Sequence, residues 1–160
     1  MSVTIRPATA ADIPALGRLG ALLVKVHHDF DPRRFIAPTP RTERGYAGFL
    51  AGQLGEKDAL VLAADVDGVV AGYTYSGVEG GDWLTLRGPA GVIYDLMVDP
   101  AHRRQGLGRR LLEETVAALE RRGAPQVMLS TAAPNAAAQK LFASAGFRAT
   151  MIEMTREVRS

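Results

Sequence analysis

The chain has 160 residues, a length that suits one domain with one hydrophobic core, because about two-thirds of the unfolded surface can then be buried. Its 19 basic and 17 acidic residues leave a formal net charge of +2, which gives little support to nucleic-acid binding. Cysteine is absent, which excludes disulfides, thiolate metal sites and a covalent cysteine intermediate. No apolar run approaches the roughly 18 residues of a membrane span, so we expect a soluble, cytoplasmic protein with no membrane partner.

The amino-terminal half is predicted to fold as a strand, two helices and a hairpin. Apolar side chains recur at steps of three and four residues from Ile13 to Val26, which indicates an amphipathic helix. The dipeptide Asp67-Gly68 favours the positive φ angles of a tight turn between two strands. We expect these elements at residues 3–6 (strand), from the caps Thr9 and Asp12 to about Asp31 (helix), at about 41–54 (weaker helix) and at 59–78 (hairpin).

The carboxyl-terminal half is predicted to alternate strands and helices. Residues 91–98 form an apolar run that only Asp95 interrupts, which is typical of a strand covered on both faces. We expect a loop over 79–90, this strand over 91–100, a helix from about Leu107 to Gly123, a strand over 126–131, a helix over 135–146 and a final strand over 150–158. This order implies an α/β fold in a single domain over residues 1–160, with one mixed antiparallel and parallel sheet and helices on both faces.

A turn rich in glycine and arginine follows the buried strand. Residues 103–110 crowd four arginines around Gly106 and Gly108. A Rossmann turn needs a third glycine where Leu111 stands, and a nucleoside-triphosphate loop needs Lys and then Ser or Thr after Gly108. What remains is an Arg-x-x-Gly-x-Gly turn before a helix, where free backbone amides can bind an anion such as a pyrophosphate. The spacing alone also allows a tight loop whose arginines lie in water.

The segment VIYDLMVDPAHRRQGLGRRLL, followed by NAAAQKLFASAGF, closely resembles the two central motifs of the GCN5-related N-acetyltransferase (GNAT) superfamily. The resemblance is specific over residues 92–147 and, through the order of elements, extends over most of residues 1–158. It implies a GNAT fold and acetyl-coenzyme A as the acetyl donor, with the pyrophosphate on the glycine turn and the pantetheine arm beside a splayed strand. No metal is expected. The donor-binding residues that it implies are Leu96, Met97, Val98, Arg103, Arg104, Gln105, Gly106, Leu107, Gly108, Arg109, Asn135 and Phe142.

Acetyl transfer to an amine needs a base, a donor to the developing oxyanion and a proton for the departing thiolate. Asp95 is the candidate base because it is the single charge inside a buried strand, although a structural carboxylate fits that position equally well. The backbone amide near Leu96 is the candidate oxyanion donor. GNAT enzymes commonly carry tyrosine where Phe142 stands, so the thiolate proton would come from Tyr94, Ser130 or water.

The acceptor side carries the weakest signals in the sequence. Residues 25–35 mix histidines, acids and arginines in the region that overhangs the acceptor site in GNAT enzymes. His27, His28 and Asp29 point in different directions at a helix end and lack a further cluster partner, which argues against a metal site. The segment is either an acceptor-recognition loop or a solvated helix end. The long loop over residues 79–90 holds further candidates for contact with a cationic acceptor, namely Glu79, Asp82 and Trp83. The alternative interpretation is a surface loop without such a role.

Together these patterns predict an N-acetyltransferase that acetylates a primary amine of a small molecule by direct attack within a ternary complex. Two alternatives remain open. One is a coenzyme A-binding sensor without turnover, which Phe142 suggests, and the other is an acetyltransferase for protein or peptide amines. The final strand would lie at an exposed sheet edge, and GNAT proteins often dimerise through such strands, so we expect a homodimer.

Overall fold

A computed structural model describes residues 1–159, and its helices and strands follow the predicted order as far as residue 144. The elements are β1 (Val3–Pro7), α1 (Ile13–Phe30), α2 (Thr42–Gln53), β2 (Ala59–Val66), β3 (Val69–Glu79), β4 (Ala90–Val98), α3 (Leu107–Arg121), β5 (Val127–Leu129) and α4 (Ala136–Ser144). Short 3-10 turns precede α1 and follow β4. Over residues 1–159, no helix has the length and apolarity that crossing a bilayer requires.

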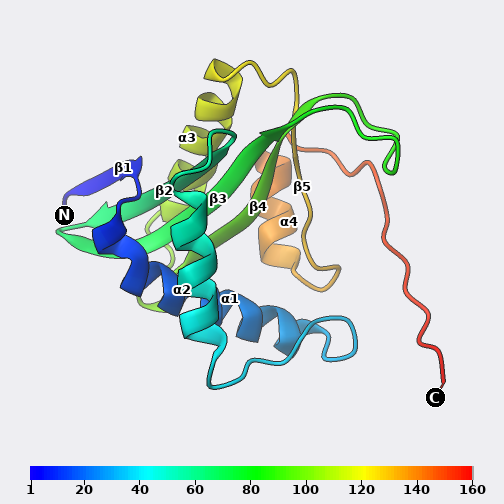
Figure 1. Cartoon of the computed structure of the whole chain (residues 1–160), viewed down its shortest axis with the longest axis horizontal. Coiled ribbons are helices and arrows are strands. Elements are labelled where there is room, and N and C mark those ends of the chain that lie inside the picture. The colour runs from blue at the N-terminus through cyan, green and yellow to red at the C-terminus, as the bar shows by residue number, and fades with distance from the viewer. Residues whose placement is uncertain (160) are drawn as a thin grey trace.

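The strands form one mixed sheet in the order β1-β2-β3-β4-β5. The first four strands are antiparallel neighbours, and β5 is parallel to β4. Asp67 and Gly68 have φ angles of 52° and 87°, as the predicted tight turn between β2 and β3 requires. In Figure 1, α1 and α2 lie in front of the sheet, and α3 and α4 lie behind it. The expected mixed sheet with helices on both faces is therefore confirmed.

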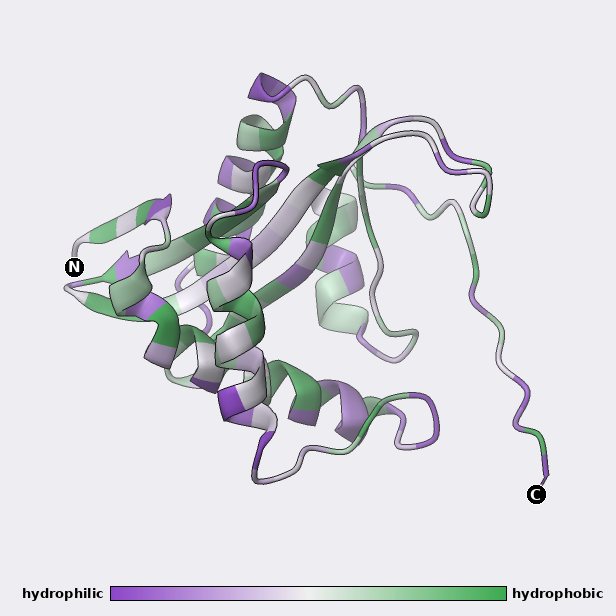
Figure 2. Ribbon diagram, viewed as in Figure 1, coloured by the Kyte–Doolittle hydropathy of each residue, from purple (hydrophilic) through white to green (hydrophobic). Residues whose placement is uncertain are grey.

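Two apolar layers hold the helices against the sheet. One layer lies between the sheet and α1 and α2, and the other lies between the sheet and α3. From α3, Leu112 and Leu119 are fully buried, and burial of one such side chain contributes about 1.5–3 kcal/mol. The glutamates and most of the arginines of α3 are exposed. Figure 2 shows the apolar stretches of β2 and β4, in green, between the helices.

Two glycines in α1 allow α2 to approach it closely. A Cβ at Gly17 would lie 2.7 Å from the Cβ of Ala47, and a Cβ at Gly20 would lie 2.1 Å from Cδ1 of Tyr46. Because glycine inside a helix costs about 0.5–1 kcal/mol relative to alanine, close packing is the physical reason for these two residues. The contact seats the Tyr46 ring against α1 with its hydroxyl directed to β4.

A β-bulge in β4 changes which face of the sheet its side chains occupy. Tyr75 of β3 pairs with Asp95. The next residue of β3, Ser76, pairs with Ile93, so Tyr94 is left as the extra residue. Ile93 packs against α3, whereas Asp95 faces α2. Regular alternation would place these two side chains on one face, so the bulge is what brings Tyr94 and Asp95 together on the face that α1 and α2 cover.

The prediction of a final strand over residues 150–158 is wrong. Residues 147–159 form neither helix nor strand, and they run away from the sheet in Figure 1. Ion pairs of Arg34 with Glu153 and of Arg33 with Glu157 join this segment to the loop after α1. An alternating pattern of apolar residues forms a strand only where the segment pairs with a neighbouring strand, and here the apolar side chains stay exposed. The strand predicted over 126–131 is also shorter, at Val127–Leu129.

Candidate active site

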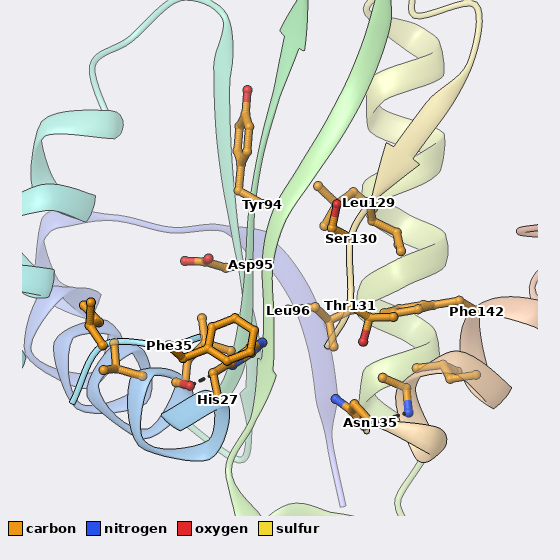
Figure 3. A pocket seen from close by; sticks show the side chains of 16 residues that line it. His27, Phe35, Tyr94, Asp95, Leu96, Leu129, Ser130, Thr131, Asn135 and Phe142 are labelled. Atoms are coloured by element: carbon orange, nitrogen blue, oxygen red, sulfur yellow. Dashed lines mark hydrogen bonds between the residues drawn. The ribbon is translucent and has the colours of Figure 1, made fainter. Parts of the chain in front are cut away.

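β4 and β5 separate after a short stretch of pairing. Residues 91–93 pair with Val127–Leu129, and beyond them the described parts of the two strands form no further pairs. The edge of β4 that faces β5 is therefore unpaired from residue 94 to residue 98. A cavity of about 290 Å³ opens at this point, between β4, the end of β5, α4, α1 and the loop after α1. Figure 3 shows Asp95 on one side of β4, and Ser130, Thr131 and Phe142 on the other.

The glycine turn lies beside the α4 wall of this cavity. Gly106 has a φ of +74° and caps α3, and a Cβ there would meet no atom within 4 Å. A Cβ at Gly108 would lie 3.6 Å from Leu141, which lines the cavity, and 3.8 Å from Val98. Within the described chain no side chain caps this end of α3, so the amides of its first turn face open space. A helix start of this kind suits the pyrophosphate of coenzyme A.

The four arginines of the turn take different directions. Arg103 and Arg104 are exposed directly before the start of α3, with Gln105 beside them. Arg109 instead lies along α3 toward Glu113, at 3.1 Å, and donates to Ser144 Oγ at the end of α4, at 2.8 Å. Arg110 donates to the carbonyl of Val3 at 3.2 Å. The geometry therefore leaves Arg103 and Arg104 as the cations nearest the uncapped helix start, and it does not place the side chain of Arg109 there.

The α4 wall of the cavity carries Phe142 and the N-cap residue Asn135. The side chain of Asn135 caps α4, because its Oδ1 accepts a hydrogen bond from the amide of Ala138 at 3.1 Å. Its Nδ2 makes no hydrogen bond to the residues described and is available to a carbonyl of a bound ligand. Phe142 reaches across the cavity toward Leu96 in Figure 3 and packs on Phe147, with ring centroids 6.1 Å apart. Phe142 makes this part of the wall apolar, and it has no proton to donate.

Of the residues Leu96, Met97 and Val98, Leu96 alone lines the cavity. The side chain of Leu96 lines the cavity, but that of Met97 is buried under α1 and α2. Val98 packs among the apolar residues under α3, and Leu107 is likewise buried there. Because the main chain of residues 96–98 is unpaired toward β5, its amides and carbonyls can pair with an extended amide-containing arm.

Asp95 lies in a buried cluster of hydroxyl groups that the sequence did not indicate. Tyr73 of β3 donates to its Oδ2 at 2.9 Å, and Tyr46 of α2 donates to the same oxygen. Burial raises the pKa of Asp95 above its usual value, and the two hydroxyl donors and the nearby His27 offset this only in part. Burial and the adjacent carboxylate also raise the pKa of Tyr46 and of Tyr73, so both remain protonated donors.

The other oxygen of Asp95, Oδ1, accepts no hydrogen bond from residues 1–159, and Asp95 is 9% exposed at the cavity wall. Below it in Figure 3 lies His27, whose Nδ1 is 2.9 Å from the carbonyl of Leu23. That contact assigns the proton to Nδ1 in the neutral ring and leaves Nε2 as an acceptor. The ring is held edge-on against Phe35, with centroids 5.0 Å apart. The cavity thus has one free carboxylate oxygen beside an imidazole.

Tyr94 does not fit the role of a proton donor to the thiolate. Figure 3 shows its ring directed away from Asp95, and its hydroxyl donates to Glu79. The ring stacks on Tyr75 with centroids 4.7 Å apart, and burial and the bond to Glu79 raise its pKa. Ser130, the other candidate proton donor, lies across the cavity from β4.

The remaining candidates lie outside the cavity. His28 Nδ1 is 3.0 Å from the carbonyl of Phe35, and Asp29 pairs with Lys25 at 2.6 Å, so neither joins His27 in a cluster. Within residues 1–159 no group of three or more histidine and carboxylate side chains could hold a metal ion. Asp82 and Trp83 lie in the β3–β4 loop, which projects beyond the sheet in Figure 1.

Solved structures share this fold. An aminoglycoside N-acetyltransferase in complex with coenzyme A has a TM-score of 0.75 and 16% identity, over 99% of this chain and 96% of that one. A protein from Bacillus halodurans has a TM-score of 0.79 and 21% identity, over 98% of this chain and 99% of that one. Both likenesses concern the fold.

The sequence itself gives the family. The Acetyltransferase (GNAT) family model matches residues 23–147, so the chain belongs to this family, and the resemblance stated above is confirmed. The chain is also 45% identical, over 60 residues, to the [ribosomal protein bS18]-alanine N-acetyltransferase of Escherichia coli (strain K12). That match covers 38% of this chain and about 40% of the length of the relative.

Proposed function

We propose that this chain uses acetyl-coenzyme A to acetylate the primary amine of a small molecule, by direct attack of the amine within a ternary complex. The observation that carries the proposal is the cavity where β4 and β5 separate. It borders the glycine turn through Leu141 and contains the buried carboxylate of Asp95 on its other side. An aminoglycoside N-acetyltransferase of the same fold holds coenzyme A, which supports the choice of donor.

Backbone groups bind most of the donor in this proposal. The first-turn amides of α3, with Arg103, Arg104 and Gln105 in front of them, bind the pyrophosphate. The unpaired edge of β4 at residues 96–98 pairs with the amides of the pantetheine arm, and Asn135 Nδ2 donates to one of its carbonyls. The thioester then lies between Leu96 and Phe142, beside the carboxylate.

Asp95 is the base in this proposal. An amine with a pKa near 10.4 costs about 4.6 kcal/mol to deprotonate at pH 7, and Oδ1 takes that proton directly or through one water. The raised pKa of Asp95 makes it a stronger base than an exposed aspartate, while Tyr46 and Tyr73 hold its other oxygen. The amine nitrogen forms a bond to the acetyl carbon, the carbon–sulfur bond breaks, and the Leu96 amide stabilises the developing oxyanion.

The thiolate receives its proton from water or from Ser130. Phe142 cannot donate, and the hydroxyl of Tyr94 is bound to Glu79. A thiol has an ordinary pKa near 8.5, so a thiolate leaves without obligatory protonation and tolerates an apolar wall. This division of roles accounts for catalysis in a chain that lacks the usual tyrosine.

The test is the release of free coenzyme A by the purified chain with acetyl-coenzyme A and a panel of primary amines. Reproducible turnover at enzyme-like rates supports the proposal. Tight donor binding in calorimetry with no release across amines, peptides and amino-terminal substrates would overturn it in favour of a sensor that binds coenzyme A without turnover.

A second candidate acceptor is the amino terminus of a protein. The observation that favours it is the match to a ribosomal-protein alanine N-acetyltransferase over 60 residues. Peptides with an amino-terminal alanine therefore belong in the acceptor panel. Higher kcat/KM for these peptides than for every small amine would assign the chain to protein acetylation.

The chain also forms a homodimer in this proposal, with the tail at residues 148–159 covering a sheet edge of a second copy. The apolar side chains of the tail lie between 72% and 92% exposed, and β5 has a neighbour on one side only in the described sheet. Exposed edges of sheets tend to be paired or covered. Light scattering at micromolar protein tests this expectation, and a monomer mass that is independent of concentration would overturn it.

A further inference from the structure

The cavity wall on the acceptor side is apolar. α1 contributes Leu23 and Val24, the loop after it contributes Phe35 and Ile36, and the ring of Tyr94 stands at the rim. The ring of Tyr94 is immobilised by Tyr75 and Glu79, so it offers a fixed face rather than a hydroxyl. Such a wall gains free energy by removing apolar surface of a ligand from water, at about 25 cal/mol per Å².

Only one carboxylate lines this cavity among the described residues. It is Asp95, whose Oδ1 accepts no hydrogen bond from residues 1–159. Glu79 contacts the cavity-lining Tyr94 as its hydrogen-bond acceptor, and it is already paired with Arg87 at 2.9 Å. A second ammonium group inside the cavity would therefore lose its hydration without a carboxylate to replace it.

The charges at the rim of the cavity are largely paired with one another. The guanidinium of Arg34 lies 4.8 Å above the ring of Phe35, which lines the cavity. Arg34 pairs with Glu153 of the tail, and Arg33 pairs with Glu157. These two ion pairs leave neither glutamate free to receive a second ammonium group of a ligand.

The volume limits the acceptor as well. The donor arm and the acceptor must share the same cavity of about 290 Å³. An acceptor that fits beside that arm is small.

We propose, on the basis of the function proposed above, that the acceptor is a monoamine with an apolar alkyl or arylalkyl body. Its ammonium group binds Asp95 Oδ1, and its body packs between Leu23, Phe35 and Ile36. The site selects against diamines and polyamines, because a second ammonium group in the cavity would lack a carboxylate partner.

The first experiment compares kcat/KM for hexylamine, 2-phenylethylamine, 1,6-diaminohexane and an alanyl peptide amide at one pH. Hexylamine and 1,6-diaminohexane differ in one terminal group, so their ratio reports the cost of the second charge. We expect both monoamines to exceed the diamine by at least about tenfold. A diamine or peptide that equals or exceeds them overturns the monoamine inference but leaves acetyl transfer intact. Donor binding with no release of coenzyme A for any compound overturns the proposed function itself.

The second experiment places a carboxylate in the apolar wall. Ile36→Glu changes a side chain that is 77% exposed, so the fold should persist, and it should shift the hexylamine to diaminohexane ratio toward the diamine by about tenfold. The matched control is Leu84→Glu, which adds the same charge in the β3–β4 loop at a residue that is 96% exposed. Equal ratios in the two variants would show that the wall does not contact the acceptor.

Discussion

The proposed donor half and the proposed acceptor half of the cavity are built in different ways. The proposed donor half comes from one continuous stretch, from Val92 to Phe147, and it offers main-chain groups at a helix start and a strand edge. The acceptor half gathers side chains from α1, α2, β3 and β4 around Asp95. Substitutions in the two halves should therefore fail differently. Changes in the donor half should weaken binding, and changes in the acceptor half should lower the rate and shift its pH dependence.

The largest effect is expected at Asp95. Asp95→Asn keeps the shape of the side chain but cannot accept a proton, so kcat should fall by about 10²–10⁴-fold while affinity for acetyl-coenzyme A is retained. The loss should shrink as the pH approaches the pKa of the amine, because more acceptor then arrives neutral. Rate measurements between pH 7 and pH 10 check this. A defect that stays constant with pH would assign Asp95 to the scaffold.

The same variant separates catalysis from stability. The pKa of Asp95 is higher in the folded chain than in the unfolded chain, so the folded state binds that proton more tightly. Stability contributed by this group is present below about pH 4, the unfolded value, and is lost as the pH rises through the folded pKa. Asp95→Asn should therefore be no less stable than the parent at pH 8. Chemical denaturation at pH 8 tests this. A clearly lower midpoint denaturant concentration for the variant than for the parent would contradict the expectation.

The donor half is tested at Gly106. Gly106→Glu combines a positive φ, which costs about 1–2 kcal/mol for a residue with a Cβ, with a negative charge at the anion site. Affinity for acetyl-coenzyme A should fall by about 100-fold in calorimetry. Gly55→Glu is the matched control, since a Cβ there also meets nothing within 4 Å and the residue has no positive φ. Unchanged affinity at position 106 would remove the turn from the donor site.

A substitution of Tyr46 tests the acceptor half while the base itself, Asp95, stays unchanged. Tyr46→Phe removes a hydrogen bond that stabilises the ionised form of Asp95, so the pKa of Asp95 should rise further. The acid limb of the pH–rate profile should then move to higher pH. The rate should fall by about tenfold at pH values on the acid limb and change little at higher pH. An acid limb that does not move would show that Tyr46 only packs there.

Gly20 tests whether helix packing positions that tyrosine. Gly20→Ala brings a Cβ to 2.1 Å from the Tyr46 ring, so the ring must move, and stability should fall by about 1–3 kcal/mol along with the rate. Gly52→Ala in α2 is the control, because a Cβ there meets nothing within 4 Å and should stabilise by about 0.5–1 kcal/mol. Denaturant unfolding measures both, and equal stability in the two variants would contradict the close packing.

The smallest effect is expected at Arg109. Its guanidinium contacts Glu113 and Ser144 rather than the start of α3, so Arg109→Ala should change donor affinity by less than about twofold. Arg103→Ala should weaken binding by roughly two- to fivefold, the range that one charge at a helix start provides. Calorimetry measures the donor affinity of both variants. A larger loss of affinity for Arg109→Ala than for Arg103→Ala would mean that the Arg109 side chain turns toward the donor when the donor binds.

The amino-acid sequence alone determined the parts of this protein that depend on local backbone preferences. The tight turn at Asp67-Gly68, the amphipathic period of α3 and the helix start after Gly106 each depend on residues that are neighbours in the chain. For this reason the donor half could be predicted as a contiguous motif. Gly17 and Gly20 inside an apolar helix were a signal of close packing, but nothing in the sequence identified the partner.

Only the tertiary structure decided the acceptor half. Regular alternation would place Asp95 on the same face of the sheet as Ile93, but the bulge at Tyr94 turns Asp95 toward α2. This bulge depends on how β3 and β4 pair. Tyr46 reaches Asp95 from 49 residues away, through the packing of α2 on α1. The tail is the converse case, since its alternating pattern predicted a strand but the tail pairs with no strand of the described sheet. Pairing, bulges and convergent side chains depend on residues far apart in the chain, so no local period in the sequence encodes them.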